Sequence, residues 1–292
     1  MSHPADLGVC EAGAALAARG LSSRELTAAC LERIRERDGV HSLDGDPESI
    51  NAWVRVYEED ALAAADRADE RLAAGDAPIL CGIPIGLKDL YAVAGKPVTA
   101  SSRVLDEVPD RDCDTWAALS AEGMVLLGHV HVHEFACGGT TDQVGSPWAL
   151  ERSAGGSSGG SSAALASKQV PVTTGTDTAG SLRIPSAFCG TSTIKPTRGV
   201  VPLDGVVPLA PTFDHPGPMT RELRDCEPLL EASMPDQHLG EHRVEELGED
   251  IQPGRRGRRL DALAWKRGER TFEPVRDVRV EVGDPRRERP AA

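Results

Sequence analysis

Aromatic residues are scarce in this sequence, and their scarcity limits how a core can be built. Phe, Trp and Tyr make up only 3% of the 292 residues, whereas apolar residues as a whole make up 40%. The core must therefore consist mainly of Ala, Val, Leu and Ile side chains. The length is enough for one large domain or two modest ones.

Long apolar runs and a basic excess are also missing. No apolar stretch approaches the roughly 18 residues of a membrane-spanning helix, and residues 1–6 do not begin a basic segment followed by an apolar run. The net charge of −14 argues against a nucleic-acid partner, because phosphate binding needs a basic surface. We therefore expect neither a membrane nor a nucleic-acid partner.

The seven cysteines are scattered and form no CxxC pair. An odd number without paired spacing is typical of buried thiols in a reducing compartment, and not of a disulfide framework or a zinc site. The expected location is the cytoplasm.

Two long helices are predicted in the first quarter of the chain. Residues 22–25 (SSRE) are typical of a helix cap, and apolar residues then recur every four positions, which predicts a helix over 22–37. An alanine-rich segment predicts a second helix over 58–74, ended by Gly75. A shorter helix is predicted around 114–122.

Short apolar runs separated by Gly, Pro and Ser predict strands. Ile83, Ile85 and Leu87 alternate, so we expect one buried face with Lys88 pointing the other way. Further extended segments are predicted at 50–54, 124–127 and 170–174, with a hairpin formed by 200–201 and 206–207. Helices that alternate with such strands predict an α/β fold with a mixed sheet.

A glycine–serine stretch covers residues 155–162 (GGSSGGSS). This composition is usual in flexible linkers, but the helix-forming segment 163–167 follows it at once. A glycine loop that opens a helix presents free backbone N–H groups and tolerates unusual dihedral angles. Taken alone, the stretch supports both interpretations.

Two further stretches place a polar residue beside an expected strand. Residues 175–185 (GTDTAGSLRIP) form a small-residue turn that can expose the hydroxyl of Ser181 and bring backbone amides together, as an oxyanion hole requires; an ordinary turn with a capping serine is the alternative. In 82–89 (GIPIGLKD), burial of Lys88 would lower its pKa and leave a neutral amine that accepts a proton; the alternative is a surface lysine at a strand end.

Together these stretches resemble the amidase signature family. Its members carry Gly-Ile-Pro-Ile-x-x-Lys-Asp, Gly-Gly-Ser-Ser-Gly-Gly and Gly-Thr-Asp-x-Gly-Gly-Ser-Ile-Arg-x-Pro. The resemblance spans roughly 22–230 and continues through 188–190 (FCG), 195–199 (KPTRG) and 213–219 (FDHPGPM). It implies the amidase signature fold, a mixed central β-sheet flanked by helices.

The resemblance also implies amide (C–N) bond hydrolysis through an acyl-enzyme. Ser181 would attack the amide carbonyl, and Ser157, preceded by a cis peptide bond, would pass the proton toward Lys88 and later to the leaving amine. The oxyanion would be stabilised by the backbone amides of Thr178, Ala179, Gly180 and Ser181. The substrate would be a small-molecule amide, the products a carboxylic acid and ammonia or an amine, and no metal or other cofactor is implied.

Three neighbouring residues are expected to support this site. The Ser158 hydroxyl would hold the loop by hydrogen bonding, and Asp177 and Arg183 would be scaffold residues rather than catalysts.

Two alternative functions follow from other features. His129, His131 and His133 alternate, which would place three imidazoles on one face of a strand. That spacing can ligate zinc, but the row still needs a further ligand and supporting hydrogen bonds, so a structural role is favoured. The second alternative is the catalytic subunit of a tRNA-dependent amidotransferase, a member of the same family that releases ammonia from glutamine for a partner subunit.

Some features depart from the family pattern. Ala179 and Thr193 stand where the family has glycine, and a side chain there could strain the backbone. The resemblance stops after about Pro235. We therefore expect 1–235 to be the N-terminal portion of the family fold, incomplete at the C-terminus, and 236–292 to be a divergent, poorly ordered tail. A sheet without its later strands would expose apolar surface, which favours pairing with another chain, for example in a homodimer. A further alternative is that the chain is a truncated, inactive homologue of the family.

Overall fold

The computed structural model of the chain describes residues 3–75, 77–234, 260–265 and 272–278. The chain divides into two units, Met1–Glu241 and His242–Ala292. Within the second unit, β9 (Leu260–Trp265) and β10 (Phe272–Val278) pair as antiparallel strands. Most of the predicted tail, 236–292, lies outside the described residues, so its poor order stays a prediction.

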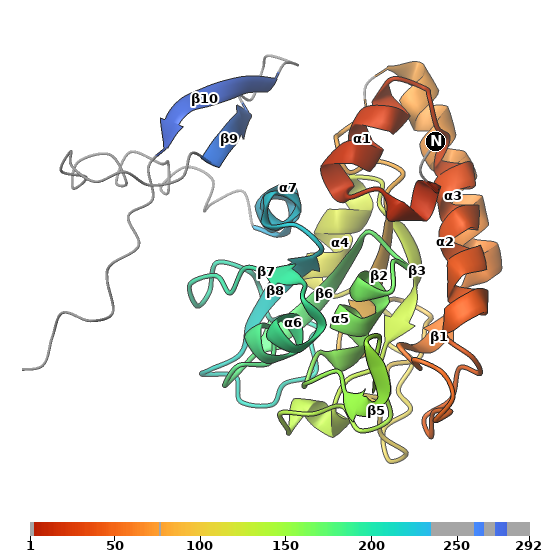
Figure 1. Cartoon of the computed structure of the whole chain (residues 1–292), viewed down its shortest axis with the longest axis vertical. Coiled ribbons are helices and arrows are strands. Elements are labelled where there is room, and N and C mark those ends of the chain that lie inside the picture. Colours follow the sequence, from red (N-terminus) through yellow and green to blue (C-terminus); the bar gives the residue numbers. More distant parts are fainter. Residues whose placement is uncertain (1–2, 76, 235–259, 266–271, 279–292) are drawn as a thin grey trace, which may run out of the picture. The chain divides into compact units, whose positions relative to one another are not determined.

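The first unit is built around a six-stranded mixed sheet (Figure 1). The strand order is β1-β3-β2-β6-β8-β7. Strand β2 is parallel to β3 and β6, whereas β1, β8 and β7 pair antiparallel with their neighbours. This confirms the predicted α/β fold with a mixed sheet. The six strands are β1 (Trp53–Val56), β2 (Pro84–Lys88), β3 (Val125–Val130), β6 (Val172–Asp177), β7 (Ser192–Thr193) and β8 (His215–Thr220).

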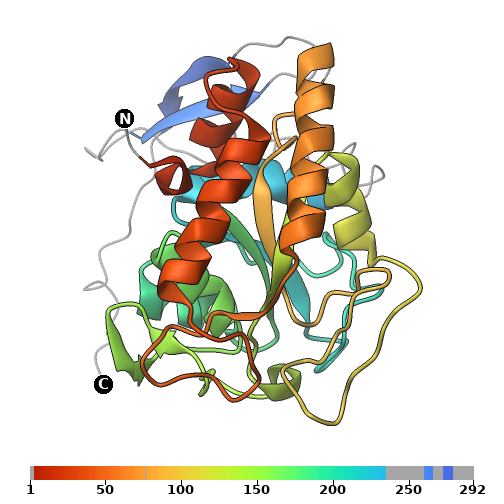
Figure 2. The ribbon, with the colours of Figure 1, turned by 90° about the vertical axis from the view of Figure 1, so that its right-hand side faces the viewer.

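Helices cover this sheet. Helices α2 and α3 lie side by side and pack against β3, as Figure 1 and Figure 2 both show. Helix α5 contacts β2, β3, β6 and β8. The helices of the first unit are α1 (Val9–Ala17), α2 (Ser23–Arg37), α3 (Glu58–Ala74), α4 (Asp114–Ala121), α5 (Gly159–Ala166), α6 (Arg183–Cys189) and α7 (Cys226–Ser233). A small hairpin of β4 (Gly145–Ser146) and β5 (Ala149–Ser153) precedes α5.

The two long helices begin and end where the sequence predicts. Ser22 caps α2: its hydroxyl accepts the N–H of Glu25 at 3.1 Å, and the Glu25 carboxylate accepts the N–H of Ser22 at 2.9 Å. Helix α3 ends at Gly75, whose φ of 86° is left-handed. Both boundaries depend on local capping chemistry, and for this reason the sequence alone predicts them.

The expected one-sided burial of β2 is wrong. All five residues of β2 are buried, and Lys88 is as inaccessible as its apolar neighbours Ile85 and Leu87. The physical reason is the position of the strand: β2 lies between β3 and β6, and helices α2 and α5 both contact it. The alternation therefore indicated a strand correctly but not the environment of Lys88.

The expected hairpin of 200–201 with 206–207 is also wrong. Val206 forms an isolated antiparallel bridge with Tyr91 instead. The N–H of Val207 donates to Leu90 O at 2.9 Å, and the N–H of Ala92 donates to Gly205 O at 3.0 Å. The segment therefore pairs with residues 90–92, which follow β2, because that pairing satisfies its backbone groups against the core.

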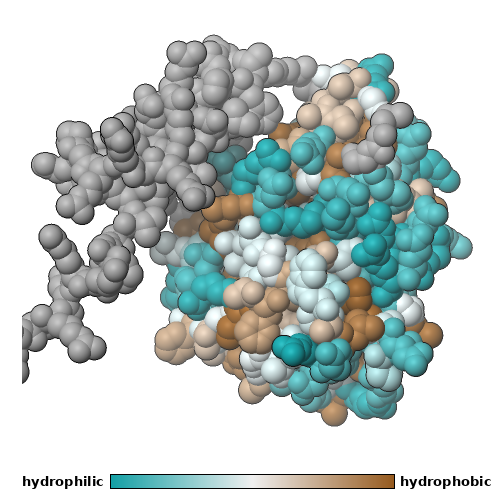
Figure 3. All heavy atoms as spheres, viewed as in Figure 1, coloured by the Kyte–Doolittle hydropathy of each residue, from teal (hydrophilic) through white to brown (hydrophobic). Residues whose placement is uncertain are grey.

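Several large apolar side chains of the first unit are exposed. Trp148, Phe188 and Phe213 are 70%, 57% and 63% exposed. The indole N–H of Trp148 donates to Cys189 O at 2.9 Å, so this ring lies against the end of α6. Figure 3 shows apolar patches between the hydrophilic areas of the surface in this view. Among the described residues, no helix is both long enough and apolar enough to cross a membrane.

Candidate active site

Lys88 is the centre of the site. It ends β2, is fully buried, and its Nζ lies 2.8 Å from Ser157 Oγ and 2.8 Å from Thr176 Oγ1. Burial lowers the pKa of the Lys88 amine to about 7, although the negative charges of Asp177 and Asp214 oppose the shift. A large share of this amine is therefore neutral near pH 7 and able to accept a proton.

Ser157 lies in the loop between β5 and α5. The Gly156–Ser157 peptide bond is cis, as the resemblance implies. The carbonyl of Ser157 accepts the N–H of His133 at 3.0 Å and the hydroxyl of Thr141 at 3.3 Å. A Cβ on Gly156 would lie 2.1 Å from Thr140 O, so only glycine fits beside this backbone. The stretch 155–162 is thus a packed loop and helix start, and not a linker.

Ser181 lies in the loop between β6 and α6 and is only 7% exposed. The structure brings Lys88 and Ser157 into direct contact, but within the described chain no hydrogen bond joins the hydroxyls of Ser157 and Ser181. The residue after Ser157 instead contacts the strand that leads to Ser181: the Ser158 hydroxyl lies 3.4 Å from both the N and the O of Thr176 in β6. Ser158 therefore supports the loop in the way that the sequence predicts.

Asp177 organises the loop that carries Ser181. Its carboxylate accepts the N–H groups of Gly180 at 2.9 Å and Leu182 at 3.3 Å, and it forms an ion pair with Arg183 at 3.0 Å. Burial alone would raise the pKa of Asp177, but the Arg183 guanidinium and these N–H groups hold it below its usual value. Asp177 is thus charged, and with Arg183 it acts as a scaffold.

The expected oxyanion donors differ in availability. The structure departs from the prediction at Gly180, because its N–H is donated to Asp177. The N–H groups of Thr178, Ala179 and Ser181 form no hydrogen bond with any described residue. Three of the four expected donors are therefore free to bind a developing negative charge.

Neither departure from the family glycines distorts the backbone. Ala179 does not adopt a positive φ, and the left-handed conformation of this loop falls on Gly180, at φ 139°. Thr193 lies in β7 opposite Met219, and its hydroxyl donates to Pro218 O at 2.8 Å. The expected strain at Ala179 and Thr193 is therefore absent.

Thr176 is a residue of the candidate site that the sequence analysis missed. Thr174 and Thr176 alternate on β6, so both side chains reach Lys88 from one face: Thr174 Oγ1 accepts the backbone N–H of Lys88 at 3.0 Å, and Thr176 Oγ1 lies at its Nζ. The alternation was visible in the sequence, but the pairing of β6 with β2 was not. Thr176 and Ser157 together fix the position of the amine.

We expect Thr176→Val to weaken the site without unfolding it. The valine keeps the shape but removes a hydroxyl that stabilises the charged amine, so the pKa of Lys88 should fall further. The plateau rate of Ser181 labelling by a fluorophosphonate at high pH should fall by about tenfold, and the pH midpoint of labelling should move to lower pH. Thr173→Val, which removes a 3.4 Å hydrogen bond to Ser161 O, is the control. An unchanged midpoint in Thr176→Val would show that this hydroxyl does not act on Lys88.

The expected row of three imidazoles on one strand face is wrong, because β3 ends at Val130, before His131 and His133. Each of the three histidines has another partner, and for His133 it is Thr140 O, 2.8 Å from Nδ1. His129 lies between the Tyr57 hydroxyl (2.8 Å) and Tyr91 O (3.0 Å). His131 Nε2 is 3.0 Å from Ser42 O, and its Nδ1 is 3.1 Å from both the Ser101 hydroxyl and the Gln143 amide. Within the described chain, no group of three or more His, Cys, Asp or Glu side chains could hold a metal ion. These imidazoles connect buried segments, which is the structural role that the sequence analysis favoured.

Comparison with known proteins places this geometry in a family. The family model described as amidase matches residues 25–257. The A subunit of the glutamyl-tRNA(Gln) amidotransferase of Pelobacter propionicus is 42% identical over 233 residues, which is 78% of this chain and 46% of that protein. Its counterpart in Anaeromyxobacter dehalogenans is 42% identical over 79% of this chain and 47% of its own length. The chain thus spans about half the length of the curated relatives that it matches.

A solved amidase structure has the same fold over most of this chain. The native peptide amidase from Stenotrophomonas maltophilia superposes with a TM-score of 0.71 at 30% identity, covering 86% of this chain and 51% of that one. Its fold is therefore shared across most of the chain described here. With the matching family model and the Lys88–Ser157 pair, this shows that the chain belongs to the amidase (amidase signature) family.

Proposed function

We propose that this chain carries the catalytic residues of a serine-dependent amide hydrolase, with Ser181 as nucleophile, Ser157 as proton relay and Lys88 as base. The observation that carries the proposal is the fully buried Lys88 amine, 2.8 Å from the Ser157 hydroxyl and with its pKa lowered to about 7. Burial destabilises a charged lysine, whereas a neutral amine beside a hydroxyl can act as a base.

The proposed reaction has two halves. Lys88 accepts the proton of Ser157 while Ser157 accepts that of Ser181, and Ser181 Oγ bonds to the amide carbon. The carbonyl oxygen becomes negative and is stabilised by the backbone N–H groups of Thr178, Ala179 and Ser181; losing one such donor typically costs about 3–4 kcal/mol. The C–N bond then breaks as the leaving nitrogen takes a proton from Ser157, and Ser157 takes one back from Lys88, which is neutral again.

Water completes the reaction. It attacks the acyl carbon and gives a proton to Ser157, while Ser157 gives its own proton to Lys88. The acyl–Oγ bond then breaks as the proton returns from Lys88 through Ser157 to Ser181 Oγ, which releases a carboxylic acid and free Ser181. The leaving group is ammonia or an amine, and the residues named here need neither a metal ion nor a cofactor. The amidase match over residues 25–257 and the likeness to a peptide amidase support this reaction class.

Fluorophosphonate labelling tests the proposal without a known substrate. The purified full chain is treated with a fluorophosphonate, digested and mapped by mass spectrometry. We expect a single adduct on the peptide that contains Ser181. An adduct confined to another serine, or none under conditions in which a control serine hydrolase reacts, contradicts the assignment.

The labelling rate should depend on pH through Lys88. Because burial lowers the pKa of this amine from 10.5 to about 7, the reactive neutral form grows as pH rises through 7. The neutral fraction is about 1% at pH 5 and about 90% at pH 8, so we expect a tenfold increase per pH unit below 7 and a plateau above 8. A rate that stays flat between pH 5 and 8 would exclude Lys88 as the base.

A second candidate function is ammonia supply within a multi-subunit amidotransferase. The observation that favours it is the 42% identity to the A subunits of two glutamyl-tRNA(Gln) amidotransferases. Under this function we expect ammonia release from glutamine only when a partner subunit is added. Release by the chain alone, as a monomer or a homodimer, favours a stand-alone amidase. The seven free thiols fit a reducing compartment such as the cytoplasm for either function.

A further inference from the structure

A second concave site lies away from the catalytic residues, between α3, α4 and the start of β3. The cavity has a volume of about 330 Å³ and contains none of the residues assigned to the reaction. Its charged lining comes from Arg67 and Arg71 on α3, with Lys96 and Asp60 beside them. Because Arg67 and Arg71 are four residues apart, they lie on one face of the helix, one turn from each other.

The two arginines carry charge that the protein does not neutralise. Within the described chain, no carboxylate lies within ion-pair distance of either guanidinium; Arg71 Nη1 donates only to Ala121 O, at 2.8 Å. Lys96, in contrast, pairs with Asp60 and lies 4.6 Å from the Tyr57 ring centre. Two guanidinium groups without an ion pair in the described chain, one helical turn apart, make the charge at this edge of the cavity locally positive, which favours an anion.

Apolar side chains line another part of the cavity, beside the polar residues Tyr57 and Ser120. Trp116 from α4 and Met124 before β3 are 6% and 4% exposed, and Leu126 lies beside them on β3. Such a surface binds an apolar group rather than a bare inorganic ion. The planar guanidinium matches a carboxylate in a bidentate arrangement.

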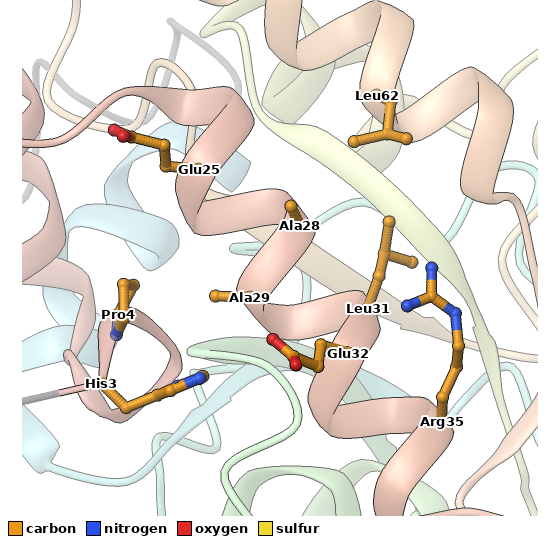
Figure 4. Close-up of a pocket in the computed structure, with 9 residues that line it drawn as sticks. All are labelled: His3, Pro4, Glu25, Ala28, Ala29, Leu31, Glu32, Arg35 and Leu62. Atoms are coloured by element: carbon orange, nitrogen blue, oxygen red, sulfur yellow. The ribbon is translucent and has the colours of Figure 1, made fainter.

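A second, larger groove lies along α2, and its lining carries more negative than positive side chains. Figure 4 shows its lining, mainly along α2, with His3 and Pro4 on one side and Leu62 of α3 on the other. Arg35 lines this groove but forms an ion pair with Glu58 at 2.5 Å, and Glu25 and Glu32 line the same space. Its charge is therefore not positive, and it offers no comparable anion site.

We propose that the cavity between α3 and α4 binds an organic monocarboxylate with an apolar tail. Arg67 and Arg71 hold the carboxylate, and Trp116, Met124 and Leu126 contact the tail. Both guanidinium groups lie at the exposed rim, so solvent screens them and the expected Kd is weak, about 1 mM. The site does not include Ser181, so the result of testing it does not depend on whether the proposed reaction is correct.

Fluorine NMR on the full chain tests this site. The probe is 4-fluorophenylacetate, and its uncharged match is 2-(4-fluorophenyl)ethanol. We expect line broadening of the acid, at least fivefold weaker binding to Arg67→Gln and to Arg71→Gln, and unchanged binding to Ser181→Ala. Arg24→Gln is the control, because Arg24 lies on α2 and pairs with Asp66. Thermal melts confirm that each variant is folded.

Each result decides the proposal. The proposal is supported if wild type and Arg24→Gln bind the acid and both cavity variants bind it at least fivefold more weakly. Equal binding of the acid and the alcohol, equal binding to wild type and Arg67→Gln, or no binding of the acid at all overturns it. Inorganic phosphate that binds in the acid's place, with no effect of 4-fluorophenylacetate, also overturns the assignment to an organic carboxylate.

Discussion

Ser181→Ala is expected to abolish fluorophosphonate labelling of this chain, lowering the labelling rate by at least about a thousandfold. The variant removes the hydroxyl on which the bond to phosphorus forms, and no other group can replace it in the same position. The loop should keep its shape, because Asp177 holds it through the N–H groups of Gly180 and Leu182 and through Arg183, and not through the Ser181 side chain. Labelling is measured by intact-protein mass spectrometry over time.

Ser186→Ala is the matched control for this experiment. Ser186 lies five residues further along, in α6, and its buried hydroxyl has no hydrogen-bond partner in the described chain. Its removal should leave the labelling rate and the melting temperature nearly unchanged. If Ser181→Ala is still labelled at the wild-type rate, the nucleophile is another residue and the proposed reaction is wrong.

Lys88→Met is expected to lower the labelling rate of Ser181 by about a hundredfold or more. Methionine fills most of the buried space but provides no amine, so the Ser157 hydroxyl loses the base that lies 2.8 Å from it. The rise of the rate through pH 7 should disappear in the same variant, because the titrating group is gone. This loss of pH dependence distinguishes a missing base from a merely disturbed site.

Lys195→Met is the control for the lysine substitution. Lys195 is exposed, and its Nζ donates only to the neighbouring Pro196 O at 3.0 Å. We expect its rate and pH profile to match those of the wild type. A Lys88→Met protein that melts like the wild type and retains the wild-type rise of rate with pH would show that another group is the base.

The sequence predicted the features of this protein that depend on neighbouring residues. The cap at Ser22 and the stop at Gly75 set helix ends because the atoms that satisfy each terminus are only a few residues away. The three motifs likewise indicated Lys88, Ser157 and Ser181, and the resemblance gave the family. Local chemistry and motif spacing are properties of the chain itself.

Only the tertiary structure decided how those residues meet. Lys88 is 69 residues from Ser157 and 88 from Thr176, so their contacts depend on how β2, β6 and the loop before α5 are arranged. The same arrangement buries Lys88 in the centre of the sheet, and this burial lowers the pKa of its amine. These are long-range contacts, and a linear pattern does not encode which distant strand lies beside which.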